Sequence, residues 1–447
     1  MHRYKGKNNY NPDLAHFEDI QNKTTNITTR EDDDMLPTTN DKLFTPIENK
    51  CVIEKIGKIE ENEIPNVNIL EFKKYGHKIK KGIIPDTIKE IIFEETSNFN
   101  HLIDKDALPK GLKKISFLSD FNQELVNTTS LRSNDIYKCI LPSNLEELYL
   151  GNLYNRILLQ DSLPITLKKL VIGKTFNKKI KFLPPSLEYL ELGNNYKHIF
   201  LKNELPKSLT HLILGDEYEQ EFEQNVLPNS LIYLKIGDNY NIEFKKGVIP
   251  ENLEWLELGN KYDMEFKIGI LPKNLKILKL GEKYNQKFLE NVLPEGLIEL
   301  SLGDSYDYIF DKGVLPNTIQ KIELGHQYSH ILNNYPDCIN ELILTGSKRN
   351  TNLINCLPLI NTIAFKNLKI KVENLPYSLE TIYIKYEQDK DLIEKIPFNC
   401  KIIISENFKD INKDINKDTD KDTDKDIAKN NLLNNPLNYD LYDIEDM

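Results

Sequence analysis

The sequence is poor in the residues on which several functions depend. Its five cysteines are far apart and include no CxxC pair, so they form neither a zinc-binding pattern nor a secreted disulfide framework. No run of about eighteen apolar residues could span a bilayer, and the first residues lack the apolar stretch of a signal peptide. We therefore expect reduced thiols in a soluble cytoplasmic protein with no role at a membrane.

Positive charge and catalytic motifs are also lacking. Lys and Arg number 58 against 69 Asp and Glu, which gives a net charge of -11, whereas proteins that bind nucleic acid in general carry a basic face. The motifs GxxxxGK[ST], GxGxxG and GxSxG do not occur. His326 and His330 have HxxxH spacing but lack the glutamate of HExxH. The sequence thus predicts no enzyme, no cofactor, no metal and no nucleic-acid partner.

What the sequence does have is a repeat. Between Leu205 and Gly325 a 22-residue unit occurs five times without insertion or deletion, and each unit opens with a proline. With this proline as position 0, apolar residues recur at +3, +6 and +8, a glycine at +9 and aromatic residues at +12 and +16. In one unit these residues are Pro206, Leu209, Leu212, Leu214, Gly215, Tyr218 and Phe222. A fixed period of this length indicates a solenoid.

The middle of each unit predicts a short strand. Leu212 and Leu214 alternate with Ile213, which is the period-two pattern of a strand with one buried face. Gly215 then allows a tight turn or a backbone conformation closed to other residues. Such a short strand cannot bury its face alone, so each coil must stack in register on the next. We predict a β-rich repeat solenoid with a parallel sheet of short strands on one face and short strands or turns on the other.

The frame carries a family resemblance. LxxLxL resembles the strand core of leucine-rich repeats. The longer frame LPxSLxxLxLGxxYNxxF, seen with Tyr240-Asn241 and Tyr284-Asn285, closely resembles the FNIP repeat of slime moulds and giant viruses of amoebae. This resemblance implies a leucine-rich-repeat-like, non-enzymatic interaction scaffold, which in several members is joined to an F-box that recruits a ubiquitin ligase. A viral member would act in the cytoplasm of its host.

One position departs from ordinary leucine-rich repeats. At +11, where those repeats place an asparagine ladder, this chain has unlike residues: Asn195, Glu217, Asn239, Lys261 and Lys283. We therefore expect no unbroken amide ladder there, and the turn must satisfy its backbone in another way.

Composition divides the chain into three parts. Residues 1–50 have sparse apolar residues and no period, so we expect a disordered segment. Although Met35-Leu36-Pro37 invites comparison with an F-box, the residues after it lack helical apolar spacing. Residues 51–405 form the repeat array, regular over 142–332 and degenerate at both ends, with an insertion near 127–138 that should emerge as a loop. Residues 406–447 are a low-complexity charged tail.

The solvent-facing side of the predicted sheet supplies the candidate binding residues. Residues at +5 of successive units should lie about 4.8 Å apart, and this column reads Tyr189, His211, Tyr233, Trp255 and Ile277. Exposed aromatic residues mark binding surfaces, although β-propensity alone also favours these residue types in strands.

The neighbouring +7 column carries alternating charges that should pair across strands: Glu191, Ile213, Lys235, Glu257 and Lys279. We predict a monomeric scaffold whose sheet face holds an unknown protein partner, a host protein if the chain is viral. The alternative is a substrate-recognition adaptor for a ubiquitin ligase.

Overall fold

A computed structural model describes most of the repeat array. The described residues are 44–47, 49–54, 57–118, 120–127, 138–330, 335–346, 359–373 and 375–405, and they belong to one compact unit. The predicted charged tail, and the predicted N-terminal segment up to residue 43, lie outside them.

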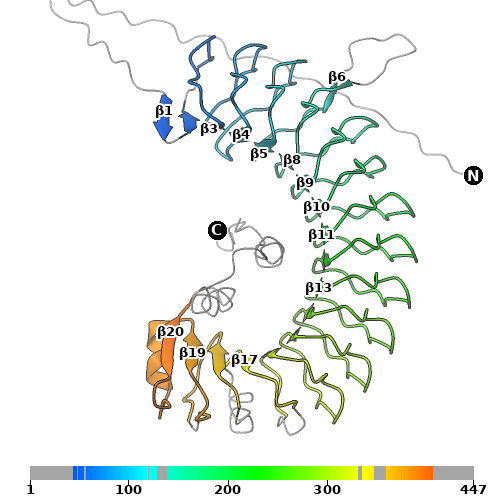
Figure 1. The fold of residues 1–447 in the computed structure, drawn as a ribbon, viewed down its shortest axis with the longest axis vertical. Helices are drawn as coiled ribbons and strands as arrows, with labels where there is room; N and C mark the ends of the chain where they lie inside the picture. The colour runs from blue at the N-terminus through cyan, green and yellow to red at the C-terminus, as the bar shows by residue number, and fades with distance from the viewer. Residues whose placement is uncertain are drawn as a thin grey trace, which may run out of the picture. The chain divides into compact units, whose positions relative to one another are not determined.

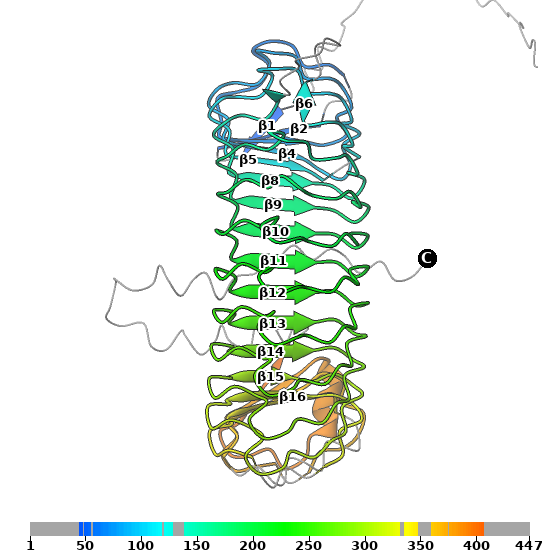
Figure 2. The same ribbon diagram turned by 90° about the vertical axis from the view of Figure 1, so that its right-hand side faces the viewer.

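One 18-stranded sheet runs through the described residues. From β2 to β20 all its strands are parallel and neighbours follow the chain order, while β1 pairs antiparallel with β2. Figure 2 shows β8 to β16 stacked one above another. The strands of this sheet are β1 (Phe44–Ile47), β2 (Lys50–Ile53), β3 (Ile69–Phe72), β4 (Glu90–Phe93), β5 (Lys114–Phe117), β8 (Glu147–Leu150), β9 (Lys169–Ile172), β10 (Tyr189–Leu192), β11 (His211–Leu214), β12 (Tyr233–Ile236), β13 (Trp255–Leu258), β14 (Ile277–Leu280), β15 (Glu299–Ser301), β16 (Lys321–Leu324), β17 (Glu341–Leu344), β18 (Thr362–Phe365), β19 (Thr381–Ile384) and β20 (Lys401–Ile404).

The leucines of the repeat form the core, and the predicted fold is confirmed. In β10 to β14 the second and fourth residues are buried and the first and third are half-buried. The register places Leu212 beside Leu234 and Leu234 beside Leu256, so like side chains meet from coil to coil. The return side of these coils consists of turns and extended segments.

The glycine at +9 is required by close packing between coils. A Cβ added at Gly215 would lie 2.5 Å from the backbone of Gly193, and one added at Gly237 would lie 2.5 Å from that of Gly215. Neither residue lies in the left-handed region. The sequence predicted that this glycine allows a tight turn or a backbone conformation closed to other residues. Its backbone conformation is an ordinary one, and glycine is required because the neighbouring coil approaches so closely.

A different position holds the left-handed backbone. At +19 the unit carries Asn or Gly, and Asn225 (φ 63°), Gly247 (φ 79°) and Asn291 (φ 65°) all have positive φ. Asparagine and glycine are the residues that adopt this conformation most readily. In the five regular units from Pro206, +19 is always Asn or Gly, and this is the sequence signal for the turn.

The coils are wider apart on the return side than at the sheet. Stacked tyrosine rings at +12 have centroids 6.1–6.4 Å apart, whereas neighbouring strands lie about 4.7–4.9 Å apart. Successive coils therefore splay like wedges, with the strands on the inner side and the return segments on the outer side (Figure 1).

Side-chain ladders satisfy the turns, at positions other than +11. At +13 the Oδ1 atom of Asn241 accepts the N–H of Asp263, and Oδ1 of Asp263 accepts the N–H of Asn285. At +10 Oδ1 of Asp238 accepts the N–H of Asn260. The backbone is thus satisfied in another way, as expected, by two oxygen ladders on either side of the position where leucine-rich repeats use one.

The ends of the array and the region of the insertion depart from the regular coils. The strands begin before residue 51, the expected start of the array, because β1 lies at Phe44–Ile47 and β2 starts at Lys50. The expected insertion loop lies outside the described residues at 128–137. On either side of it, β6 (Val126–Asn127) pairs antiparallel with β7 (Lys138–Cys139). A 3-10 helix, η2 (Glu387–Leu392), packs near β19.

Candidate functional site

Five side chains line up across the middle of the sheet. Each is the first residue of its strand, β10 to β14, and the register places each directly beside the next. All five are half-buried. We call these residues the aromatic column: Tyr189, His211, Tyr233, Trp255 and Ile277.

The rings of the column stack on one another. Centroids are 5.8 Å apart between Tyr189 and His211 and 5.7 Å apart between His211 and Tyr233, with ring planes within 30° of parallel. Trp255 lies 5.3 Å from Tyr233 and is tilted by 57°. Lys169 Nζ sits 4.2 Å above the Tyr189 ring, and Lys279 Nζ sits 4.9 Å above Trp255. Because each ring face packs against another ring or lies under a lysine, the stack exposes mainly ring edges to a ligand.

The polar atoms of these rings are mostly held by neighbours. The Tyr189 hydroxyl donates to Glu191 (2.7 Å) and the Tyr233 hydroxyl donates to Glu257 (3.3 Å). Burial and then the adjacent carboxylate raise the pKa of both tyrosines, so both hydroxyls stay protonated. Burial and then Lys169 lower the pKa of His211, which keeps its ring uncharged at neutral pH.

Trp255 is the exception in the column. Its Nε1 atom is covered by neighbouring atoms and has no hydrogen-bond partner among the described residues. A buried donor without an acceptor costs about 1–3 kcal/mol, and such groups in native proteins call for an explanation. The side chain as a whole remains half-exposed.

A groove runs beside the column, at the carboxyl ends of β12 to β14. Its volume is about 260 Å³. One wall is made by +7 side chains and the other by +10 side chains, and glycines at +9 form its floor. The +7 and +10 lining residues are Lys235, Glu257, Lys279, Asp216, Asp238 and Asn260.

The charges at +7 pair in part as predicted. Lys235 forms an ion pair with Glu257 (2.6 Å) across strands. Lys279 pairs with Glu299 (3.1 Å), which belongs to the +5 column of the next coil. The +7 and +5 columns therefore share one layer of side chains, and the sheet face around the aromatic column is largely neutral.

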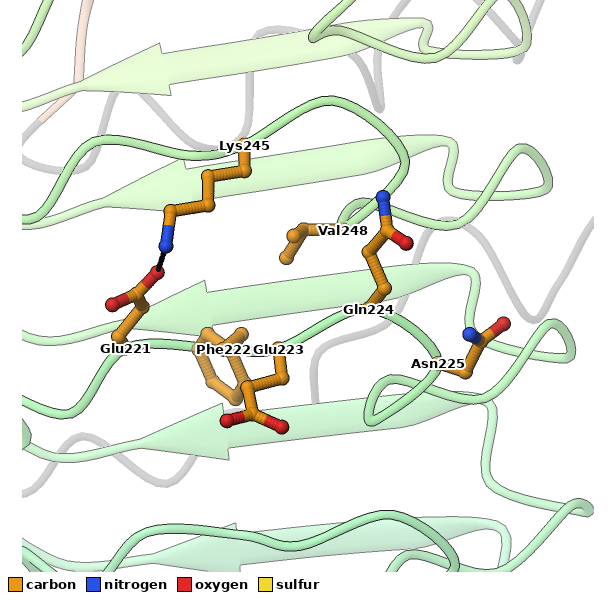
Figure 3. Close-up of a pocket in the computed structure, with 7 residues that line it drawn as sticks. All are labelled: Glu221, Phe222, Glu223, Gln224, Asn225, Lys245 and Val248. Atoms are coloured by element: carbon orange, nitrogen blue, oxygen red, sulfur yellow. Dashed lines mark ion pairs between the residues drawn. The ribbon is translucent and has the colours of Figure 1, made fainter.

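A second hollow, of about 490 Å³, lies on the return side (Figure 3). Glu221 faces Lys245 in an ion pair, and Gln224 Nε2 donates to the carbonyl oxygen of Lys246 (2.9 Å). The next coil repeats the ion pair between Glu243 and Lys267 (2.5 Å). The polar lining is thus a ladder that links coils, and we assign it a structural role.

Three other titratable residues singled out in the sequence form hydrogen bonds with the preceding coil. His330 Nε2 is 2.8 Å from the carbonyl oxygen of Asp307, and the His326 N–H donates to Asp304. Cys338 Sγ donates to the carbonyl oxygen of Ile319 (3.0 Å). Within the described residues, no three His, Cys, Asp or Glu side chains are grouped as metal ligands. Those same residues include no helix that is long and apolar enough to cross a bilayer.

Comparison with known families fixes what the repeat is. The FNIP Repeat model matches residues 99–129 and, in overlapping copies, the whole of 133–327. The chain belongs to the FNIP repeat family. The FNIP units include every strand of the aromatic column. The comparison with curated proteins gave no match.

Solved structures place the FNIP array among leucine-rich-repeat folds. CroV588, described as a novel circular leucine-rich-repeat protein and coming from a giant virus, is 30% identical with a TM-score of 0.61. The match covers 78% of this chain and 58% of CroV588. The Toll protein of Drosophila, solved with Spatzle, is 14% identical with a TM-score of 0.50, over 79% of this chain and 54% of that one. The chain thus spans little more than half of these neighbours.

The FNIP frame separates structural positions from free ones. From β10 to β14 the +6 position is Leu in every unit, while +5 changes from Tyr to His, Tyr, Trp and Ile. This column was predicted from the spacing of the sequence. The lysines that cover its ends and the groove beside it were not predicted, because both depend on how side chains of neighbouring coils meet.

Proposed function

We propose that this FNIP protein is a non-enzymatic, monomeric, cytoplasmic scaffold whose sheet face, centred on Tyr233 and Trp255, holds a protein partner. The observation that carries the proposal is the aromatic column, which is in register, half-exposed and free of the constraints of the repeat frame. Tyrosine and tryptophan are the side chains that most often dominate protein interfaces.

The chemistry of the face supports a protein over a nucleic acid. Flat ligands such as bases bind by stacking on open ring faces, and here Lys169 and Lys279 cover the ends of the stack. Trp255 Nε1 has no hydrogen-bond partner among the described residues, and a rotation of the indole would offer it to a peptide carbonyl, which is an acceptor that every protein partner carries.

The test is affinity purification from the native host cell with Tyr233→Ala and Trp255→Ala combined. We expect the double variant to keep its circular dichroism spectrum and to lose a partner that the unaltered chain retains. Tyr308→Ala is the matched control, because this tyrosine is 40% exposed on the return side and its loss should retain that partner. An unchanged set of partners in the folded double variant would refute the proposed face.

The adaptor hypothesis is tested in the same purification. Ubiquitin-ligase recruitment is implied only by the F-box that is joined to FNIP repeats in several other proteins. Cullin-complex components that copurify with the unaltered chain would favour it, and their absence would count against it.

A further inference from the structure

The groove beside the aromatic column carries a charge that the protein does not neutralise. Its two lysines are engaged, since Lys235 pairs with Glu257 and Lys279 with Glu299. Its two aspartates, Asp216 and Asp238, form no ion pair within the described residues; they accept hydrogen bonds only from backbone N–H groups and from asparagine amides. Negative charge therefore remains on the +10 wall.

These two carboxylates lie on adjacent coils and are half-buried. The backbone N–H of Asp238 donates to Asp216 Oδ1 (3.3 Å). The two like charges therefore lie on neighbouring coils and repel each other in a site that is shielded in part from water. A cationic group that enters the groove relieves this repulsion, and complementary charge of this kind selects partners and speeds their association.

The geometry also specifies what must accompany the cation. The aromatic column lies on the same sheet face as the +7 wall of the groove, and its ring edges are apolar. Arginine and lysine carry long apolar stems below their charged heads. A segment lying across this face can therefore set apolar side chains against the edges of Tyr233 and Trp255 while a long basic side chain reaches toward the aspartates.

We infer, on the basis of the proposed function, that the partner contacts this face through a cationic polypeptide segment. Its basic side chains, of which arginine fits two carboxylates best, meet Asp216 and Asp238. Its apolar side chains meet the aromatic column.

Trp255 makes the inference directly measurable, because it is the only tryptophan of the chain. The probes are three pools of 12-residue peptides without Trp or Tyr. Their alternate positions vary among Leu, Val, Ile and Phe, and the positions between are all Arg, all Gln or all Glu. Binding to the full chain is followed by Trp255 fluorescence and by calorimetry.

We expect the Arg pool to bind about tenfold more tightly than the Gln pool, to shift the Trp255 emission and to weaken as salt rises. Asp216→Asn with Asp238→Asn should remove this preference, since asparagine keeps an oxygen for the ladder but no charge. Asp304→Asn is the matched control: it occupies the same +10 column but lies outside the groove, and the preference should survive.

The outcomes separate the two proposals. If the Gln pool binds as tightly as the Arg pool and Tyr233→Ala with Trp255→Ala weakens both, the face binds protein but the cationic preference is wrong. Tighter binding of the Glu pool also overturns the inference. If the Arg pool binds with no change in Trp255 emission and no effect of the double alanine variant, both the inference and the proposed face fail.

Discussion

Several tyrosines at position +12 carry a hydroxyl group into the core, and not all of these groups find a hydrogen-bond partner among the described residues. Tyr262 is fully buried, and its hydroxyl has no hydrogen-bond partner among the described residues. Phe121 and Phe176 occupy the same position in other coils and stack in the same row of rings. The ring, rather than the hydroxyl, is therefore what the coil requires.

Tyr262→Phe should consequently preserve or raise stability. Removing a buried unsatisfied hydroxyl relieves a desolvation cost of about 1–3 kcal/mol, less a small loss of contacts, so we expect the melting temperature to rise by a few degrees. Tyr308→Phe, at a 40% exposed site, should change nothing. A drop in melting temperature for Tyr262→Phe alone would show that the hydroxyl has a bonding role.

Two glycine positions of the repeat should respond in opposite ways. Gly237→Ala places a Cβ 2.5–2.7 Å from backbone atoms of the preceding coil, and overpacking of this kind costs about 1–3 kcal/mol or more. Gly247→Asn should be nearly neutral, because Asn225 takes the same left-handed conformation one coil earlier. Chemical denaturation of both variants measures the difference, and equal midpoints would contradict the assignment of the two roles.

At the scale of the element, the sequence predicted the strands but not the ladders between turns. Leucines at +6 and +8 have the period of a strand, so β10 to β14 follow from the pattern alone. The turn has Asn or Asp at most of the +10 and +13 positions, but that both accept a backbone N–H depends on the path of the next coil. The asparagine of the Tyr-Asn pair, as in Asn241, was the visible signal.

The same holds for the candidate site. Register places every +5 residue in one column, so the aromatic column could be read from spacing. The groove could not, because its walls come from +7 and +10 side chains of different coils. The covering of Trp255 by Lys279 likewise depends on a side-chain conformation that no spacing specifies.

A carboxyl pair at the end of β3 and β4 should make stability depend on pH. Burial and a hydrogen bond to Glu71 raise the pKa of Glu94 to about 7. Burial opposes ionisation of Glu71, but its hydrogen bonds with Glu94 and Lys50 outweigh this and lower its pKa. Near neutral pH the two groups therefore share one proton.

The direction in which stability changes with pH follows from the linkage between proton binding and folding. The folded state binds the Glu94 proton more tightly than the unfolded state does, so this contribution to stability is complete below about pH 4.3–4.5 and is lost as pH rises through 7. Glu94→Gln keeps a donor toward Glu71 at every pH, so its melting temperature relative to the unaltered chain should be higher at pH 8 than at pH 5. Glu95→Gln, at an exposed neighbouring site, is the control. Parallel pH profiles for Glu94→Gln and the unaltered chain would rule out the shared proton.

At the scale of the whole array, the splay of the coils follows from residue size on its two sides. Glycines at +9 bring the strand side of neighbouring coils into backbone contact, while stacked rings at +12 hold the return side more than 6 Å apart. The repeat sequence contains both facts. Their consequence was not drawn from it, because spacing along the chain does not show how far apart neighbouring coils lie at each of their positions.

Because each coil packs mainly on its two neighbours, damage to one should spread along the array. Leu256 is fully buried in β13, and Leu256→Ala should cost about 2–5 kcal/mol. Nearest-neighbour coupling transmits part of this loss to β12 and β14, whose backbones are hydrogen-bonded to β13. Hydrogen exchange should therefore quicken in all three strands and return to normal several coils away. Ile268→Ala, at a 63% exposed site of the same unit, should leave exchange unchanged. Faster exchange confined to β13 would mean that each coil is stable by itself. Uniformly faster exchange over the array would mean that the array unfolds as one body. Either result would contradict a stack that is held together by the interfaces between neighbouring coils.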